Sequence, residues 1–288
     1  MDKKGRLSAV GGDERQLYIA RELEASGFDV DIFGIDGSRD TVWSIVEAMK
    51  NADYLLLPIP LTRDGYRLNC SQDVLLMDLL DMIPKETTVL AGKLPPFFAD
   101  HLSAKGIAFS DYYEDKEYIM RNAEITAEGA VSMLMNESKR TVDEMRILVC
   151  GYGRIGKCLV KKLTALGAFV TVAARKKEAL LEAKLCFSAD TDMIDYTRDG
   201  IFDTCKKYDV IFNTVPSRLF DETCACVLEN SIYFELASPP YGGSAEFIRS
   251  KAGKFILASG IPGKYAPESA GKAAYEAISR CLFTEAKI

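Results

Sequence analysis

Short apolar runs recur along the chain and are separated by stretches long enough to form amphipathic helices. In the first half, runs of strand length occur at 7–10, 28–34, 54–60, 87–92 and 106–112. A second series follows at 145–151, 167–175, 208–216, 231–238 and 254–260. Strands that alternate with helices form parallel sheets covered on both faces. The pattern therefore predicts an α/β protein with two doubly wound parallel-sheet domains, the second a Rossmann domain.

Two longer helical segments interrupt this alternation of strands and helices. Apolar spacing predicts one helix over 122–139, with Thr126 as its candidate N-cap, and a final helix over 268–285. The chain should therefore comprise an N-terminal flavodoxin-like α/β domain for substrate or partner (1–121), a connecting helix (122–143), a Rossmann NADP-binding domain (144–264) and a C-terminal helix that packs back on the first domain (265–288).

The strongest motif is the stretch "ILVCGYGRIGKCLVKKLTALGAFVTVAAR" (147–175), in which Gly151, Gly153 and Gly156 lie between a strand and a helix. The first glycine allows a tight turn, the second lets a pyrophosphate approach the backbone, and the third lets helix and strand pack closely. The backbone N–H groups of Arg154 and Ile155 should face the phosphates from the start of the helix. The alternative is a plain turn between packed elements.

The end of the following strand bears on which dinucleotide binds. NAD sites place an acidic residue there, but this strand ends in Ala174 and Arg175, followed by two lysines. Arg175 suits a 2′-phosphate, so the expected cofactor is NADP, with NAD as the second possibility. The alternative is that Arg175 to Lys177 form only a solvated turn.

Later strand ends should line the nicotinamide half of the same site, because ligands of open parallel sheets bind beyond the carboxyl ends of the strands. The residues expected there are Asn213, Thr214, Val215, Pro216, Ala237 and Ser238.

The first strand ends differently, in "GGDERQ" (11–16), which lacks the third glycine of a dinucleotide turn. It offers Asp13, Arg15 and Gln16 instead, a set that suits a carboxylate better than a pyrophosphate. The alternative is that Arg15 and Gln16 form the solvated side of a first helical turn.

Composition narrows the class of protein. The 288 residues carry a net charge of −6, which argues against nucleic acid or an anionic membrane as partner. No apolar run is long enough for a membrane span and no signal peptide opens the chain, so a cytoplasmic protein is expected. The only close cysteine pair, Cys224 and Cys226, has the wrong spacing for zinc, so no metal is expected. His101 is the only histidine, which excludes a mechanism based on paired histidines.

Several motifs, taken in order, resemble the A-subunit family of dipicolinate synthase. They are "GGDERQ", "NAEITAEGA" (122–130), "GYGRIG", "FNTVPS" (212–217), "ELAS" (235–238) and "GIPGKYAPESAG" (260–271). The resemblance implies an NAD(P)-dependent oxidoreductase that oxidises dihydrodipicolinate, formed from 4-hydroxy-tetrahydrodipicolinate, to dipicolinate during sporulation. It also implies an NADP-type cofactor and, as partner in a heteromeric complex or other oligomer, the B subunit of dipicolinate synthase. The location that it implies is the mother cell of a spore-forming bacterium.

Candidate residues for this chemistry follow from the two carboxylates of such a substrate. Arg15, Arg63 and Lys264 are the candidate cations, and Asp13, Gln16 and Thr126 complete the expected substrate-binding set. Glu128 is the candidate catalytic base, with Arg15 as the other catalytic group. The alternative is that Glu128 is a structural carboxylate at a helix start.

Two other functions stay open. A 2-hydroxyacid-dehydrogenase-like enzyme would need an acid–base group, usually histidine, after the last strand of the nucleotide domain, and "SGIPGKYAPESAG" contains none. A non-catalytic NADP-binding regulatory subunit is the second alternative.

Overall fold

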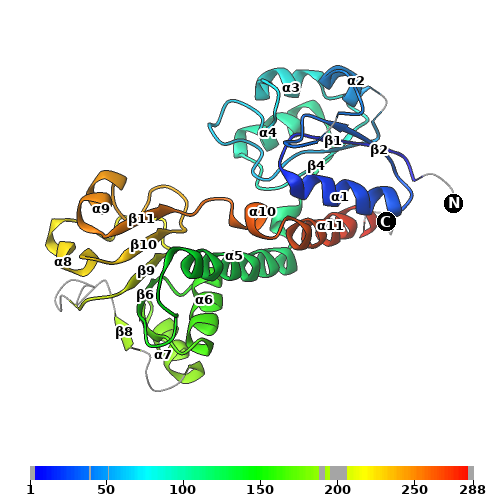
Figure 1. Cartoon of the computed structure of the whole chain (residues 1–288). Coiled ribbons are helices and arrows are strands. Elements are labelled where there is room, and N and C mark those ends of the chain that lie inside the picture. The colour runs from blue at the N-terminus through cyan, green and yellow to red at the C-terminus, as the bar shows by residue number, and fades with distance from the viewer. Residues whose placement is uncertain (1–3, 39, 51, 188–191, 195–205, 285–288) are drawn as a thin grey trace. The chain divides into compact units, whose positions relative to one another are not determined.

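The computed structural model describes residues 4–38, 40–50, 52–187, 192–194 and 206–284 (Figure 1). It divides into two compact units. The first comprises Met1–Asn122 together with Pro262–Ile288, and the second comprises Ala123–Ile261. Residues 285–288 of the expected C-terminal segment lie outside the described residues.

The first unit is built on a five-stranded parallel sheet in the order β2-β1-β3-β4-β5. This is the strand order of flavodoxin-like folds. The strands are β1 (Arg6–Val10), β2 (Asp29–Phe33), β3 (Tyr54–Leu56), β4 (Thr88–Ala91) and β5 (Phe109–Asp111).

Alternating side chains of these strands bury both faces of the sheet. Leu7 and Ala9 of β1 pack on the face covered by α1 (Glu14–Ala25) and α11 (Pro267–Thr284), whereas Val10 packs on the opposite face. That opposite face is covered by α2 (Ile45–Met49), α3 (Leu76–Met82) and α4 (Pro96–Lys105). Because both faces are covered, polar groups of the sheet concentrate at its edges and strand ends.

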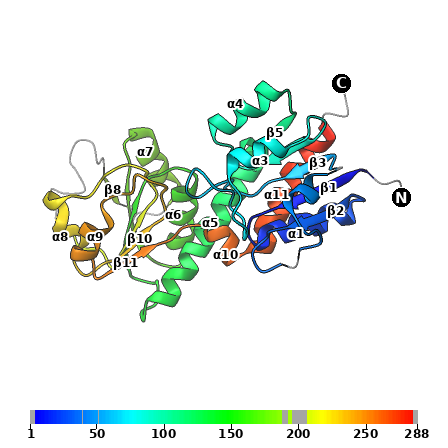
Figure 2. The same ribbon diagram turned by 90° about the horizontal axis from the view of Figure 1, so that it is seen from above.

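The end of the chain packs against its beginning. Helix α11 lies beside α1 in both views (Figures 1 and 2). Gly271 permits this close approach, since a Cβ there would lie 2.6 Å from Cβ of Tyr18 and 2.9 Å from the carbonyl oxygen of Arg15. Arg280 secures the other end of α11 through two hydrogen bonds to Asp115, at 2.7 and 2.8 Å.

The second unit contains a six-stranded parallel sheet in the order β11-β10-β9-β6-β7-β8. Read from β8, this is the strand order of dinucleotide-binding domains. The strands are β6 (Arg146–Cys150), β7 (Phe169–Ala173), β8 (Asp192–Ile194), β9 (Val210–Asn213), β10 (Ile232–Glu235) and β11 (Lys254–Leu257). The predicted fold class, two doubly wound parallel sheets with a second Rossmann-type unit, is confirmed.

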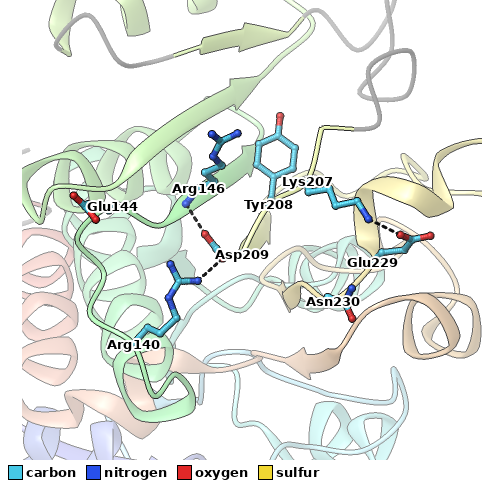
Figure 3. A pocket seen from close by; sticks show the side chains of 8 residues that line it. All are labelled: Arg140, Glu144, Arg146, Lys207, Tyr208, Asp209, Glu229 and Asn230. Atoms are coloured by element: carbon cyan, nitrogen blue, oxygen red, sulfur yellow. Dashed lines mark hydrogen bonds and ion pairs between the residues drawn. The ribbon is translucent and has the colours of Figure 1, made fainter.

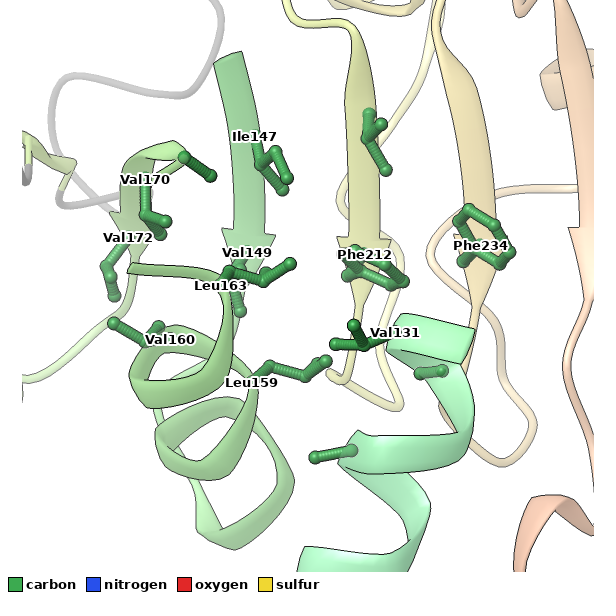
Figure 4. Close-up of a cluster of buried hydrophobic side chains, with 14 of the residues drawn as sticks. Val131, Ile147, Val149, Leu159, Val160, Leu163, Val170, Val172, Phe212 and Phe234 are labelled. Carbon is green, nitrogen blue, oxygen red and sulfur yellow. The ribbon is translucent and has the colours of Figure 1, made fainter. Parts of the chain in front are cut away.

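Helices cover both faces of this sheet as well. Figure 4 shows Val149, Val172 and Phe212 of the strands packed against Leu159 and Leu163 of α6 (Arg154–Ala165) and against helix α5 (Lys116–Glu137). Helix α7 (Lys177–Cys186) joins the same core, and the opposite face is covered by α8 (Ala225–Leu228) and α9 (Ala245–Lys251).

Helix α5 differs from the connecting helix expected from the sequence. It begins at Lys116 rather than at Asn122, and the division between the two units falls inside it. Ala127, Ala130 and Leu134 are fully buried in the core of the second unit. Most of α5 is therefore a core helix of that unit, because its small and apolar face packs on the sheet.

Among the described residues, no helix has the length and apolar character needed to cross a membrane. The same part of the chain contains no cluster of three or more His, Cys, Asp or Glu side chains suited to a metal ion.

Replacing Gly271 by Ala tests the packing of α11 on α1. At an uncrowded helical position this change would stabilise the protein by about 1 kcal/mol. Here the new methyl group would overlap Tyr18 and the Arg15 carbonyl, so we expect a loss of about 1–3 kcal/mol in the free energy of unfolding, measured by urea titration. The exposed control Ser269→Ala should change it by less than about 0.5 kcal/mol. A more stable Gly271→Ala protein would show that the helices are not tightly packed.

Candidate functional site

The glycine turn after β6 has the geometry of a dinucleotide site. Gly151 has a φ of +95°, which favours glycine, and a Cβ at Gly156 would lie 2.2 Å from the carbonyl oxygen of Gly151. The strand therefore turns sharply and α6 approaches it as closely as the backbone allows. The first and third glycines of the motif have the roles that the sequence predicted for them.

Gly153 has the opposite property, because a Cβ built there would meet no heavy atom within 4 Å. Gly153 is also the N-cap of α6, and no side chain of the described residues caps this helix start. The first-turn amides of Arg154, Ile155 and Gly156 therefore lack a capping side chain. Such a helix start attracts an anionic group through its N–H donors and the helix dipole.

The end of β7 presents cations beside this turn. Ala173 and Ala174 are buried, whereas Arg175 and Lys176 are exposed immediately after them. Strands β6 and β7 pair in parallel, with Cys150 opposite Ala173, so both chain segments leave the sheet at the same edge. Arg175 is thus exposed at the same edge as the glycine turn, and its contact with a 2′-phosphate stays a prediction.

The turn after β9 packs directly on the glycine turn. The hydroxyl of Thr214 donates to the carbonyl of Cys150 at 2.8 Å, and the Thr214 amide donates to the same oxygen at 2.9 Å. A Cβ at Gly151 would lie 2.4 Å from Oγ1 of Thr214 and 2.8 Å from Cγ2 of Val215. Asn213 is fully buried, and its side-chain amide donates to Val215 O and to Glu235. The Asn213 side chain therefore shapes the turn rather than facing solvent.

Glu235 is a buried carboxylate at this edge that sequence reasoning did not select. It ends β10 with 1% exposure and accepts hydrogen bonds from Asn213, Tyr233 and two backbone amides. Burial raises the pKa of the Glu235 carboxyl, although these donors act against that shift. A glutamate at the end of the otherwise apolar run "IYFE" was the signal that could have identified it.

The turn after β1, in the first unit, is organised around an ion pair. Asp13 is the N-cap of α1, and its carboxylate also accepts two hydrogen bonds from Arg15, from Nε at 2.8 Å and from Nη2 at 2.7 Å. The same Nη2 donates to the carbonyl of Ile59 at 2.7 Å. The paired donors of Arg15 are thus engaged by a carboxylate of the chain itself.

The alternative that Arg15 and Gln16 lie on a solvated helix face is wrong. Arg15 is 7% exposed and Gln16 is 2% exposed, because α11 packs on this part of α1. The amide nitrogen and oxygen of Gln16 have no hydrogen-bond partner among the described residues. Burial by itself would raise the pKa of the Asp13 carboxyl, but the hydrogen bonds and charge of Arg15 outweigh burial and lower it.

Two segments that carry predicted cations lie near this turn and come from distant parts of the chain. The positive charge of Arg63, which is exposed, also lowers the pKa of Asp13. Gly263, in α10 (Ile261–Tyr265), is so close that a Cβ would lie 2.7 Å from both Asp13 Oδ2 and Arg15 Nε. The exposed Lys264 follows directly. The "GGDERQ" and "GIPGKY" motifs therefore fold together, which their separation in sequence did not reveal.

Thr126 and Glu128 do not occupy a helix start, as the sequence had suggested. Both lie well inside α5, because the helix begins at Lys116. Thr126 is buried and Glu128 is exposed, with its carboxylate 3.2 Å from Nζ of Lys162 on α6. Thr126 belongs to the second unit, whereas the Asp13 turn belongs to the first. The ion pair favours the structural interpretation of Glu128.

A hollow of about 460 Å³ lies at the opposite, amino-terminal edge of the second sheet (Figure 3). Its charged side chains largely neutralise one another: Arg140 pairs with Asp209 at 2.6 Å, and Lys207 pairs with Glu229 at 2.8 Å. Paired charges of both signs give this hollow no clear preference for a charged ligand. The carboxyl edge, with its open helix start, remains the candidate site.

The chain is similar in sequence and in fold to known proteins. Residues 6–113 match the family model for the N-terminal domain of the dipicolinate synthase A subunit. The chain is 25% identical to the dipicolinate synthase A subunit of Bacillus subtilis, with 96% of the chain and 95% of that protein covered. The crystal structure of the dipicolinate synthase A subunit from Bacillus halodurans superposes with a TM-score of 0.84 at 23% identity, covering 98% of this chain and 99% of that one. D-lactate dehydrogenase from Escherichia coli superposes with a TM-score of 0.65 at 13% identity, covering 98% and 97%.

The fold is thus that of two-domain dehydrogenases, with a Rossmann-type unit and a flavodoxin-like unit. Within that fold class, residues 6–113 are similar to the N-terminal domains of dipicolinate synthase A subunits. The resemblance to the A-subunit family seen in the sequence motifs is confirmed over nearly the whole chain.

Replacing Asp13 by Asn tests the ion pair at the β1 turn. Removing the half-buried Asp13 leaves the buried charge of Arg15 uncompensated, so we expect a loss of about 3 kcal/mol in the free energy of unfolding at pH 7. Because folding lowers the pKa of Asp13, its contribution is fully present above the ordinary value of 3.8 and is lost as the pH falls through the lower folded-state pKa. The stability difference between wild type and variant, measured by urea titration, should therefore shrink below that pH.

The matched control is Asp81→Asn, which removes an exposed pair with Lys105 and should change stability far less. A pH-independent difference for Asp13→Asn would mean that the Asp13 charge does not contribute.

Proposed function

We propose that this chain is an NAD(P)-dependent oxidoreductase subunit that oxidises dihydrodipicolinate to dipicolinate. The observation that carries the proposal is the Gly151–Gly156 turn, whose uncapped helix start and open space at Gly153 fit a dinucleotide pyrophosphate. The similarity of the chain to dipicolinate synthase A subunits supports the choice of substrate.

NADP is the proposed cofactor. Arg154, Ile155 and Gly156 would hold the pyrophosphate through their backbone amides, and Arg175 would bind the 2′-phosphate with charge-assisted hydrogen bonds. No carboxylate precedes Glu178 after β7 to repel that phosphate. The turns at Thr214–Pro216 and Ala237–Ser238 would contact the nicotinamide half.

The first unit would carry the dicarboxylate substrate at the turn after β1. Arg63 and Lys264 are exposed there and able to meet carboxylates, and the unpaired, buried amide of Gln16 offers a donor and an acceptor. Arg15 and Asp13 would hold the turn in shape through their ion pair. This division of roles assigns recognition to the exposed cations and positioning to the buried pair.

The reaction removes one hydride and one proton from the substrate ring and leaves an aromatic pyridine. When bound, the nicotinamide ring supplies the hydride acceptor. The residues of the chain need only orient the two rings, because aromatisation supplies the driving force. A water molecule or a weak base then suffices for the proton.

The biological setting rests on the resemblance. It comprises a B subunit that completes a heteromeric enzyme, and the cytoplasm of the mother cell during sporulation. Dependence on a partner would fit the engagement of Glu235, the buried carboxylate at the carboxyl edge of the second unit, by four donors of the chain itself.

Cofactor choice is tested by Arg175→Asp. The variant loses a phosphate contact and gains an acid suited to a ribose hydroxyl, so we expect NADP affinity to fall about thirtyfold and NAD affinity to rise. Fluorescence titration with NADPH and NADH measures both. As a second variant, Gly153→Ala adds a methyl group in open space, so it should preserve stability while weakening both cofactors. Unchanged NADPH affinity in Arg175→Asp would leave Arg175 a surface residue.

The reaction is tested with the purified chain, NADP and freshly formed dihydrodipicolinate, with and without the B subunit. We expect NADPH and dipicolinate to form in equal amounts when B is present, and little of either without it. Full activity of the chain alone would contradict the dependence on B. Activity on 2-hydroxy acids instead would favour the lactate-dehydrogenase-like alternative, and cofactor binding without any turnover would favour a regulatory role.

A further inference from the structure

One buried carboxylate links two turns at the carboxyl edge of the second sheet. Oε1 of Glu235 accepts from Nδ2 of Asn213 at 2.7 Å and from the amide of Ala237 at 3.2 Å. Oε2 accepts from the amide of Gly242 at 2.9 Å and from the hydroxyl of Tyr233 at 3.1 Å. The donors come from the end of β9, from β10 itself and from the loop that follows β10.

The network leaves little freedom to either turn. Asn213 accepts from the Val215 amide and donates to the Val215 carbonyl, so the orientation of its side chain is set. Gly242 is enclosed, since a Cβ would lie 2.4 Å from the Tyr233 hydroxyl and 2.7 Å from Nδ2 of Asn213. A buried acceptor with two donors on each oxygen therefore fixes the turn at 213–215 and the loop at 236–242 together.

Burying the charge of the Glu235 carboxylate costs free energy. If its role were only to stabilise the fold, an apolar side chain in its place would serve as well. The position of the two turns suggests a more specific role. Thr214 and Val215 pack on the glycine turn, and Ala237 and Ser238 extend from the neighbouring strand end. Any error in these turns would displace groups beside the bound dinucleotide by a distance that matters for hydride transfer.

We propose that Glu235 is a positioning residue that fixes the nicotinamide half of the cofactor site without touching the cofactor. The inference rests on the proposed function, because it presumes that a dinucleotide binds at this edge. It assigns the adenine half to the glycine turn and Arg175, and the geometry of the reactive half to the Glu235 network.

Glu235→Gln is the sharpest test, because it keeps the size of the side chain. If the amide oxygen of the new glutamine takes the place of Oε1, beside Asn213 and Ala237, its NH₂ group faces the amide of Gly242, so that two donors oppose each other. In the flipped orientation the NH₂ group faces the donors of Asn213 and Ala237 instead. We expect NADPH affinity to fall about tenfold, while affinity for 2′,5′-ADP, which lacks the nicotinamide half, changes less than about twofold. Fluorescence titration and calorimetry measure the two affinities.

Glu229→Gln is the matched control, since Glu229 precedes the same strand at its other end and pairs with the exposed Lys207. It should change neither affinity. Tyr233→Phe removes one donor and keeps the carboxylate, so it should weaken NADPH binding selectively but to a smaller extent. It also provides the decisive comparison if Glu235→Gln fails to fold.

Equal loss of both probes in the folded variants, or loss of neither, would overturn the positioning role. Wild-type protein that binds neither NADPH nor 2′,5′-ADP would instead overturn the proposed function itself.

Discussion

Both units are governed by the burial of their parallel sheets on two faces. Once helices cover both faces, a polar group that must meet a ligand can lie only where the strands end. Gly151 and Arg175 in the second unit, and Asp13 and Gln16 in the first, all follow the carboxyl ends of strands. The apolar strands thereby confine the chemistry to two edges, and the loops at those edges carry whatever specificity the protein has.

Buried carboxylates stabilise these loops in two different ways. Asp13 pairs with an arginine, so its charge is compensated and its pKa is lowered. Glu235 has only neutral donors, and burial raises its pKa. The first arrangement links the start of α1 to the carbonyl of Ile59, and the second links two turns of one sheet. Each unit thus has an acidic side chain that helps to hold its edge in shape.

Local patterns were sufficient to predict much of the fold and the glycine turn at 151–156. Apolar runs separated by helix-length stretches predicted both sheets, and the glycine spacing predicted the turn at 151–156. The ends of the helices were harder to predict, since nothing in the sequence marked Lys116 rather than Asn122 as the start of α5. As a consequence, the sequence placed Glu128 at a helix start. In the structure Glu128 lies inside α5 and forms an exposed ion pair with Lys162. Helix starts depend on which residues are buried, and burial is a property of the whole fold.

The sequence by itself determined the fold class, the glycine turn at 151–156 and the basic end of β7, because these depend on residues close together in the chain. Only the tertiary structure decided that Arg15 pairs with Asp13, that Gly263 and Gly271 pack against α1, and that Asn213, Tyr233 and Gly242 share Glu235. Most of these contacts join segments from distant parts of the chain. Their energies depend on burial and mutual geometry, which no local pattern of hydrophobic and polar residues specifies.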